Sequence, residues 1–580
     1  HGKDFWPADI EIAADANGQP VVGGPCLQEI EIAPALSLAH TRGVACALAA
    51  ESDGQTGVGI DIEPLQEMNA DVVGAAFDAR EIKLLASNDW KLRAWCAKEA
   101  AGKALGTGLG SPRNFAVCKI QKQSGLIHIE SKARKSAIPV LTQQSGEFVT
   151  AVTSVKVTTP KKAPFIRRVI ALEAGRKLEA LCILDPAEDI FLDDHTLGRE
   201  LAVGDRSLNG LPVVPLTVTM EIMAEAAALL KPGRIVTGMK DIRAYRWIDL
   251  DRSPVTLKIT AVADGSESVG VKVCESDGNG LIAEADVVLA EGFPEAPVAD
   301  AFEPIRKRKS IWKPAELYTE GMFHGPTFRG VESVEAWGEN GSEATLIGMA
   351  ADRFFASTKT PAFETDAIVL DAAGQLLAYW YVEEHPEIGF NTYPYKVDEL
   401  RLFGPSLKKG EKARGRVRVE KALPQQLRAH IDVIDDAGRI RMQLIGWEDR
   451  PFKLPEAFYR ARYKPVETIL SHSREDIAVE FKSEGLIECC TMADYPDSLL
   501  HAHGLIWLKA LAHTVLSRNE RELWRALEGS EKEKTEWLLE RIAAKDAVRL
   551  HLRKSGVRVG LTDVDIQTDS NGQATAQGAW

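Results

Sequence analysis

Apolar residues recur at helical spacing in the stretch from Glu364 to Trp380. Four of them follow one another at intervals of three or four positions: Leu370, Ala373, Leu377 and Trp380. This spacing predicts a helix with one apolar stripe. Asp371 and Gln375 are four positions apart, so they would lie one turn above each other on that helix. A buried carboxylate and amide are costly without a function, although the helix dipole also favours an aspartate near a helix start.

A second apolar helix is predicted at residues 220–227, after a loop that contains His195 and a turn that contains Pro215. Stretches rich in Val and Ile then predict strands at residues 254–263, 268–274 and 281–290. The same order returns further along the chain, where a loop with His324 precedes more strands, the helix of residues 364–380 and further strands to Trp447. The pattern therefore predicts two similar units in tandem.

Alternation of apolar and acidic residues predicts a strand at residues 57–63. Ile60 and Ile62 alternate with Asp61 and Glu63, so a strand would put both carboxylates on one face. Neighbouring carboxylates repel each other unless a cation lies between them, and oxygen ligands of this kind suit Mg²⁺. A pair of acids on a strand is also common on a solvated face.

A helix is predicted at residues 95–104, on which Glu99 and Lys103 are four positions apart and face the same way. Upstream, residues 36–49 predict two strands around a polar turn at residues 40–42, which includes His40. Residues 9–20 predict a strand that runs into an Asn-Gly turn. A turn histidine and a surface Lys-Glu pair are each ordinary features when taken alone.

Helices are predicted in the last part of the chain, at residues 499–527 and 535–549. On the second helix, Arg541, Lys545 and Arg549 would line one face. Such a stripe fits either a solvated surface or a grip on a phosphate-rich ligand. Residues 563–573 then repeat residues 9–19 in step, with Asp, Ile, Asp, Asn and Gly at corresponding places.

Composition narrows the classes of function. The 580 residues suffice for about three to four domains. The net charge of −14 argues against wholesale nucleic-acid binding. Eight scattered cysteines form no CxxC pair, and we find neither a signal peptide nor an apolar run of about 20 residues. These features indicate a cytoplasmic protein without membrane contact. The chain opens with His1 and stops at Trp580 just after a turn signal, so we expect a piece cut from something longer.

The strand at residues 57–63 and the helix at residues 95–104 together resemble the catalytic half of the surfactin-synthetase type of 4′-phosphopantetheinyl transferase. That family carries a G-[IV]-D-x-E strand and a later W-x-x-K-E-[AS]-x-x-K helix, and this chain matches both. The resemblance implies that Asp61, Glu63 and Glu99 hold Mg²⁺ against the pyrophosphate of coenzyme A. It further implies that Glu99 or a metal-held water takes the proton from a carrier-protein serine.

The same resemblance implies that His40 and Lys103 contact coenzyme A phosphates. Residues 535–549 resemble the first half of the same family, in which a basic helix touches coenzyme A, and this assigns that role to Arg541 and Lys545. The second half of a transferase thus precedes the first half. Either the chain comes from a longer array with two transferase units, which the duplicated stretch favours, or the two halves complement each other within or between chains.

Residues from about 165 to 467 resemble the double hot-dog dehydratase domain of polyketide synthases. The resemblance rests on Asp194-His195, the turn at Pro215, the stretch His324–Phe328 and the motif Asp371-x-x-x-Gln375. One departure is that Gly198 lies three residues after the histidine, where common family members have four. The sequence of residues 211–227 most resembles dehydratase domains of iterative synthases of the enediyne or polyunsaturated-fatty-acid kind.

Dehydration of a β-hydroxyacyl thioester requires a base at the α-carbon and an acid at the β-hydroxyl. His195 suits the base, because an imidazole titrates near neutral pH. Asp371 suits the acid, because an apolar seam raises a carboxyl pKa. Gln375 would orient Asp371 or the departing water, and no metal is needed. The alternatives are a scaffold that docks carriers without turnover and a cyclase-type hot-dog domain that reuses the same pair.

We therefore expect an α+β protein, with a central double hot-dog of antiparallel sheets wrapped on long helices and α+β transferase-like half-domains on either side. The expected domains are residues 1–158 (catalytic second half of the transferase), 165–467 (dehydratase) and 468–580 (first half). The expected partner is an acyl carrier protein with its phosphopantetheine arm, and the expected cofactors are coenzyme A and Mg²⁺. We also expect a homodimer formed through the dehydratase.

Overall fold

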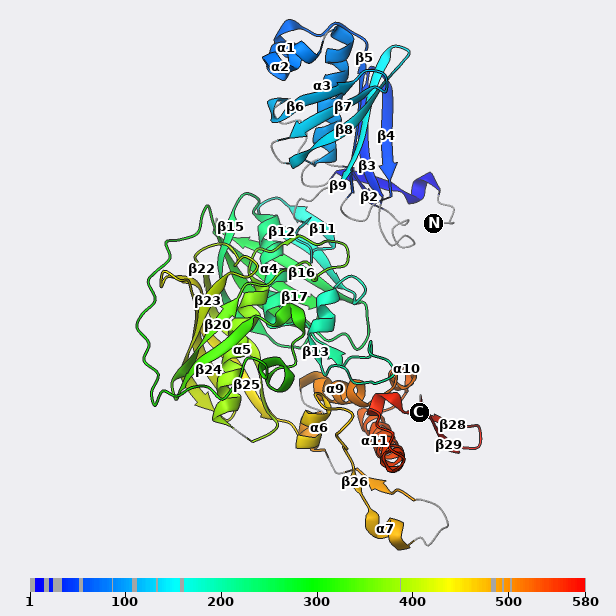
Figure 1. Ribbon diagram of the computed structural model, residues 1–580, viewed down its shortest axis with the longest axis vertical. Coiled ribbons are helices and arrows are strands. Elements are labelled where there is room, and N and C mark those ends of the chain that lie inside the picture. The colour runs from blue at the N-terminus through cyan, green and yellow to red at the C-terminus, as the bar shows by residue number, and fades with distance from the viewer. Residues whose placement is uncertain are drawn as a thin grey trace. The chain divides into compact units, whose positions relative to one another are not determined.

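A computed structural model divides the chain into two compact units, His1–Pro160 and Lys161–Trp580 (Figure 1). The structure describes residues 6–14, 20–23, 34–51, 56–85, 87–106, 112–131, 134–156, 161–265, 267–385, 387–480, 487–492, 495–500, 503–578 and 580. Among these residues, no helix combines the length and the apolar character that crossing a bilayer requires.

The first unit is an antiparallel five-stranded sheet crossed by one long helix. The strand order is β5 (Thr56–Pro64), β9 (Phe148–Lys156), β8 (Arg134–Ser145), β7 (Leu126–Ser131) and β6 (Phe115–Gln121). Helix α3 (Asn88–Ala104) packs on this sheet, and the short helices α1 (Ala70–Ala76) and α2 (Ala79–Leu84) precede it. A Cβ on Gly59 would lie 1.8 Å from the carbonyl oxygen of Ala100, so glycine lets β5 and α3 approach closely.

The hairpin β3 (Ala35–Thr41) and β4 (Val44–Ala50) packs Ala39 against the isoleucines of β5. Its turn lies at Arg42 and Gly43, with φ angles of 42° and 79°. The sequence predicted this turn two residues earlier, around His40. The turn forms later because Gly43 adopts positive φ without a Cβ clash, so His40 belongs to the end of a strand.

The second unit contains a twelve-stranded antiparallel sheet made of two similar halves. The first half is β11 (Arg168–Glu173), β12 (Lys177–Leu184), β16 (Val255–Asp264), β17 (Ser268–Glu275), β18 (Leu281–Ala290) and β15 (Ile235–Ala244). The second half is β22 (Phe390–Leu402), β25 (Ile440–Lys453), β24 (Gln426–Ile434), β23 (Lys412–Leu423), β20 (Gly341–Ile347) and β19 (Val331–Gly338). The halves join where β15 pairs with β22.

Each half-sheet wraps one apolar helix, α4 (Leu216–Leu230) in the first half and α5 (Ala367–Glu384) in the second, and one core contains both helices (Figure 1). This is the double hot-dog that the sequence predicted. The four apolar residues of the predicted stripe on α5 are all buried. Asp366 starts α5, because its side chain accepts a hydrogen bond from the Val369 backbone.

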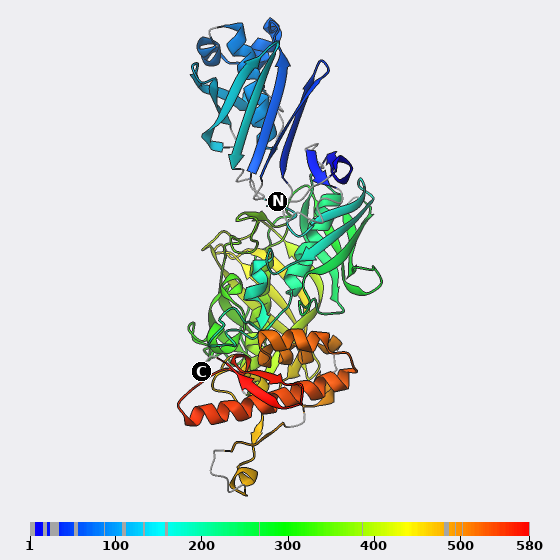
Figure 2. The ribbon, with the colours of Figure 1, turned by 90° about the vertical axis from the view of Figure 1, so that its right-hand side faces the viewer.

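The C-terminal helices α9 (Ile506–Val515), α10 (Arg518–Ala526) and α11 (Glu531–Lys554) form a layer against one end of the double hot-dog (Figure 2). They share a hydrophobic core with α6 (Glu456–Ala461) and with Leu197, Leu211 and Val213 of the loop that follows His195. The remaining helices and strands are short: β10 (Lys161–Lys162), β13 (Thr196–Leu197), β14 (Leu211–Pro212), β21 (Pro361–Ala362), β26 (His472–Ser473), α7 (Glu475–Glu480), β27 (Cys490–Thr491) and α8 (Asp497–Leu500).

The sequence repeat is also a structural repeat. A 3-10 turn at Pro7–Asp9 precedes β1 (Glu11–Ala14) and β2 (Pro20–Gly23), and one at Leu561–Asp563 precedes β28 (Asp565–Thr568) and β29 (Ala574–Gln577). In each copy an aspartate accepts a hydrogen bond from the backbone three residues earlier, at 2.9 Å and 2.7 Å. The predicted Asn17-Gly18 turn lies outside the described residues. The copies differ in burial: Val564 and Ile566 are buried, whereas Ile10 and Ile12 are exposed.

Candidate active sites

His195 lies directly after the 3-10 turn Ile190–Asp194 and before β13, at the wall of a cavity. Its Nδ1 is 2.6 Å from the carbonyl oxygen of Val213. A carbonyl only accepts, so Nδ1 carries the proton and Nε2 keeps a free lone pair. Burial lowers the pKa of His195 to about 4. The imidazole is therefore neutral at physiological pH, with one nitrogen able to accept a proton.

Asp371 lies on α5 and lines the same cavity. Burial raises the pKa of Asp371 to about 7, although a hydrogen bond from Gln375 opposes this. Gln375 donates from Nε2 to the carboxyl Oδ2 at 2.8 Å and to the Phe328 carbonyl at 3.0 Å. The hydroxyl of Tyr318 donates to Gln375 Oε1 at 2.9 Å. Gln375 is thus fixed from three sides and holds the carboxyl group in place.

His324 is a site residue to which the sequence assigned no role. Its Nε2 is 3.4 Å from Asp371 Oδ2, and its ring centre is 5.0 Å from that of His195. Ligand atoms of His195, His324 and Asp371 all lie within 4.8 Å of one another. The signal that could have found His324 is its place in the tandem pattern, because it precedes the second helix as His195 precedes the first.

Hydrogen bonds join the His195 loop to the His324 loop. The Asp194 carboxylate accepts from the backbone and the hydroxyl of Thr327, at 3.0 Å and 2.6 Å. The Gly325 backbone donates to the Asp194 carbonyl at 2.7 Å. A Cβ on Gly325 would lie 1.7 Å from Arg199 Nη1 and 2.1 Å from Asp194 Oδ1, so a larger residue there would displace this ion pair. These contacts bring the two histidines together from separate halves of the fold.

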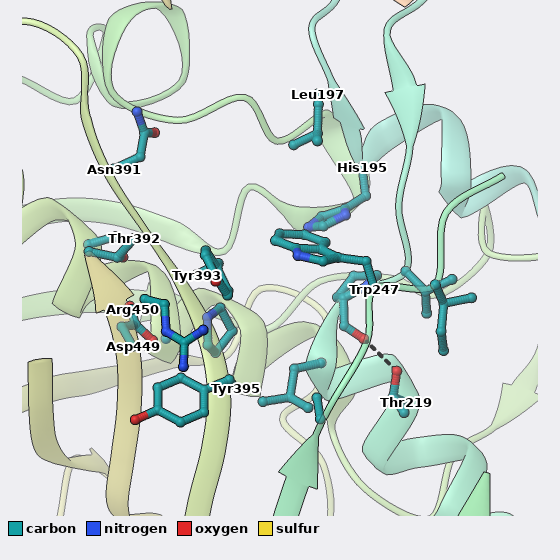
Figure 3. A pocket seen from close by; sticks show the side chains of 18 of the residues that line it. His195, Leu197, Thr219, Trp247, Asn391, Thr392, Tyr393, Tyr395, Asp449 and Arg450 are labelled. Carbon is teal, nitrogen blue, oxygen red and sulfur yellow. Dashed lines mark hydrogen bonds between the residues drawn. The ribbon is translucent and has the colours of Figure 1, made fainter. Parts of the chain in front are cut away.

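The cavity has a volume of about 1090 Å³ and contains all four candidate groups: His195, His324, Asp371 and Gln375. Figure 3 shows His195 and Trp247 on one wall, facing Tyr393, Tyr395 and Arg450 from β22 and β25. Part of the lining comes from outside the double hot-dog, namely Arg462, Gly504, Trp507 and Lys509. The space is large enough for an extended acyl thioester with aromatic walls around it.

A second candidate site lies in the first unit, where β5 meets α3. Asp61 Oδ1 accepts from Lys103 Nζ at 2.9 Å, while Oδ2 is buried and meets no hydrogen-bond donor in the described residues. Burial and the neighbouring Asp61 carboxylate raise the pKa of Glu99 to about 8, and the same two causes raise the pKa of Glu63. Crowded carboxylates with an orphaned oxygen fit a divalent cation, which would relieve their repulsion.

The other residues assigned to this site differ in their surroundings. Lys103 donates to Asp61 and to the Ile60 carbonyl, at 2.9 Å and 3.0 Å, so its ammonium is engaged with the acidic strand. His40 is exposed at the end of β3. Within the described residues, the compact three-ligand group is the one in the second unit, so Asp61, Glu63 and Glu99 do not all lie within 4.8 Å of one another.

Two of the three cations in the basic stripe of α11 are buried inside the protein. Lys545 is fully buried, pairs with Glu520 and donates to the Val515 carbonyl at 2.7 Å. Arg549 is buried and donates to Asp546 at 2.7 Å. Arg541 lies over the ring of Trp537, at 4.6 Å from its centre. Internal partners satisfy Lys545 and Arg549, which places Lys545 away from a ligand, whereas Arg541 Nε meets no hydrogen-bond acceptor in the described residues and lies 3.7 Å from Glu520.

Two family models match the chain. The 4′-phosphopantetheinyl transferase superfamily matches residues 57–153, and the N-terminal dehydratase domain of polyketide synthases matches residues 313–453. The first match includes Asp61, Glu63, Glu99 and Lys103 but not His40. The second match includes Asp371 and Gln375, whereas His195 lies before it.

The solved structures that match the chain include dehydratase domains of polyketide synthases. The dehydratase domain from the CurF module of curacin polyketide synthase has 14% identity and a TM-score of 0.38, and covers 50% of this chain and 100% of its own. A trans-AT polyketide synthase dehydratase domain from Brevibacillus brevis has 15% identity and a TM-score of 0.38, with 50% and 98% covered. The dehydratase domain of RzxB from Pseudomonas fluorescens has 13% identity and a TM-score of 0.37, with 50% and 100% covered.

The family models identify two enzyme domains in this chain, a 4′-phosphopantetheinyl transferase superfamily domain at residues 57–153 and a polyketide synthase dehydratase domain at residues 313–453. The transferase domain implies coenzyme A as the phosphopantetheine donor. Both domains imply acyl carrier proteins as partners. The assignment rests on the family models and on the double hot-dog described above.

Proposed function

We propose that the second unit removes water from β-hydroxyacyl groups on a carrier protein, with His195 as the base and Asp371 as the acid. The observation that carries this proposal is the pairing of opposite pKa shifts in one cavity. Burial lowers the pKa of His195 to about 4 and raises the pKa of Asp371 to about 7. At pH 6 the imidazole is therefore free to accept a proton while the carboxyl group still carries one.

In this mechanism Nε2 of His195 removes the α-proton, and the electrons of that C–H bond form the new double bond. The bond from the β-carbon to oxygen breaks as Asp371 donates its proton, so water leaves. Gln375 donates to Asp371 at 2.8 Å and stabilises the carboxylate that this step creates. His324, whose Nε2 is 3.4 Å from Asp371 and whose ring centre is 5.0 Å from that of His195, would return the proton from His195 to the carboxylate.

The first unit would transfer phosphopantetheine from coenzyme A to a carrier-protein serine. Asp61, Glu63 and Glu99 would hold Mg²⁺, which supplies charge neutralisation at the pyrophosphate. The orphaned Asp61 Oδ2 and the raised pKa of Glu99 support this assignment. Lys103 positions Asp61 through their 2.9 Å ion pair. His40 would contact a coenzyme A phosphate in this unit. In the separate transferase first half, Arg541 would contact a coenzyme A phosphate, and Lys545 would do so only if its buried contacts opened.

We place the protein in an iterative polyketide or polyunsaturated-lipid synthase of the cytoplasm, with the transferase catalytic half at residues 1–158, the dehydratase at 165–467 and the transferase first half at 468–580. A homodimer through the dehydratase is supported by β11, an edge strand with exposed apolar side chains at Val169, Ile170 and Leu172. Light scattering of a Val169→Asp variant tests this, since a dimer that uses this edge would dissociate.

A 3-hydroxyacyl thioester assay tests the dehydratase proposal. We expect His195→Ala to lose about 10²–10⁴-fold in rate, because it removes the base. His430→Ala is the matched control, since His430 lies on β24 outside the cavity lining. Full activity in His195→Ala would remove this residue from the mechanism. Carrier binding without turnover in the wild-type protein would favour the scaffold alternative, and ring formation in place of water loss would favour a cyclase.

A further inference from the structure

The dehydratase cavity contains a buried arginine whose charge no described carboxylate neutralises. Arg462 follows helix α6 and is only 2% exposed. Its guanidinium lies over the rings of Tyr459 and Tyr463, at 5.2 Å and 5.4 Å from their centres. Neither Nε nor Nη2 meets a hydrogen-bond acceptor in the described part of the chain. A buried guanidinium in this state is costly, so its position favours a ligand that brings an acceptor.

Other cations of the cavity are already paired with carboxylates. Four lining residues have such a partner: Arg243 with Asp241, Arg246 with Glu275, Lys396 with Glu448 and Lys509 with Asp249. Arg450 also lines the cavity, but it is exposed to solvent and lies over Tyr395. Arg462 therefore differs from its neighbours in being both desolvated and unpaired among the described residues.

Arg462 lies where the C-terminal helices meet the loop of the catalytic histidine. Its carbonyl oxygen accepts from the Arg199 backbone at 3.4 Å, which ties it to the segment just after His195. Trp507 of α9 lines the same cavity and packs against Phe452 at 4.6 Å and Trp247 at 6.3 Å between ring centres. This wall combines aromatic surfaces, which suit an amide chain, with one cation.

We infer that Arg462 binds the phosphate of the phosphopantetheine arm on which the acyl substrate is carried. The inference rests on the proposed dehydratase function. The thioester and the two amides of this arm are neutral, so its phosphate is the one anionic group that it brings to the protein. A guanidinium recognises phosphate through two parallel hydrogen bonds, and Nε with Nη2 presents that pair of donors. The C-terminal segment would thus complete the substrate site of the double hot-dog.

Three thioesters of one 3-hydroxyacyl group test this inference: N-acetylcysteamine, pantetheine and 4′-phosphopantetheine. We expect Arg462→Gln to raise KM for the phosphopantetheine substrate roughly tenfold to a hundredfold, the range for a lost charge-assisted hydrogen bond. The kcat and the KM for the two phosphate-free substrates should not change. Arg462→Lys should recover part of the loss. Arg460→Gln is the matched control, because Arg460 is exposed and paired with Glu456.

Two results would overturn the inference. One is an equal loss in kcat/KM for all three substrates in a folded Arg462→Gln variant, which would assign the arginine to the acyl end or to stability. The other is a wild-type enzyme that does not distinguish phosphopantetheine from pantetheine. If the wild-type protein dehydrates none of the substrates, the proposed function fails instead. Calorimetric binding of free 4′-phosphopantetheine, with and without Arg462, then decides the role of the arginine separately.

Discussion

Replacing Asp371 by asparagine should stabilise the second unit and abolish dehydration at the same time. The Asp371 side chain is 12% exposed, and burial raises its pKa from 3.8 to about 7. The unfolded chain therefore releases this proton near pH 4 and the folded chain near pH 7. Wild-type stability falls as the pH rises through that window, whereas asparagine does not ionise. Its side-chain oxygen can still accept the hydrogen bond from Gln375.

The size of the effect follows from the two pKa values. At about 1.4 kcal/mol per pH unit, the buried carboxyl group costs about 4 kcal/mol at pH 8 and about 1.5 kcal/mol at pH 5. The gain in unfolding free energy from Asp371→Asn should thus be about 2–3 kcal/mol larger at pH 8 than at pH 5. The rate of dehydration should fall about 10²–10⁴-fold, since the proton donor is lost.

Pulse proteolysis in urea, with mass spectrometry of peptides from residues 161–580, measures this stability without assuming that both units unfold together. Asp352→Asn serves as the control, because Asp352 is exposed in the same unit. An equal gain for Asp371→Asn at both pH values would mean that Asp371 is already ionised at neutral pH. That result would refute its role as the acid, whatever the activity of the variant.

Three further predictions concern pH, metal and packing. The kcat/KM for dehydration should be highest between about pH 4 and 7. It should fall above pH 7 because Asp371 loses its proton, and below pH 4 because His195 gains a proton. A profile that does not fall on the alkaline side would contradict the assignment of Asp371 as the acid. Chelation with EDTA should stop phosphopantetheinyl transfer, which the mass of the carrier protein reports, and should leave the rate of dehydration unchanged. Loss of dehydration would instead indicate a metal ion bound by His195, His324 and Asp371. Lys545→Ala should destabilise the second unit by about 3–5 kcal/mol, because it removes the nearer of the two cations that face the buried Glu520 and leaves Arg541 at 3.7 Å. A change below about 1 kcal/mol in urea unfolding would show that Arg541, a proton or water compensates the charge of Glu520.

Helical periodicity was sufficient to predict α4 and α5, because apolar side chains at helical spacing form a face that is stable only when it is buried. It also put Asp371 and Gln375 on neighbouring turns, and their 2.8 Å hydrogen bond agrees with that placement. The same periodicity did not reveal which way the basic face of α11 turns. Lys545 can be buried because it forms an ion pair with Glu520 on another helix. The sequence around residue 545 does not indicate that partner.

The sequence did not predict the role of His324, because its partners are also distant along the chain. Its contact with Asp371 depends on how two halves of a sheet meet at β15 and β22, and on Asp194 holding the two loops together. Sequence spacing describes neighbours along one element, whereas this site is assembled from three. The turn after β3 was also predicted imprecisely, because it forms at Arg42 and Gly43 and not around His40.

The paired hairpins at the two ends of the chain show that similar local sequences can contribute differently to hydrophobic packing. The β28–β29 copy lies on α11, where Val564 and Ile566 contribute to a small core with Val548 and Leu552. Its counterpart β1–β2 is preceded by the same 3-10 turn and the same capping aspartate, yet Ile10 and Ile12 face solvent. Polar changes should therefore be tolerated at Ile12 and harmful at Ile566, so a mutational map of one hairpin would misjudge the other.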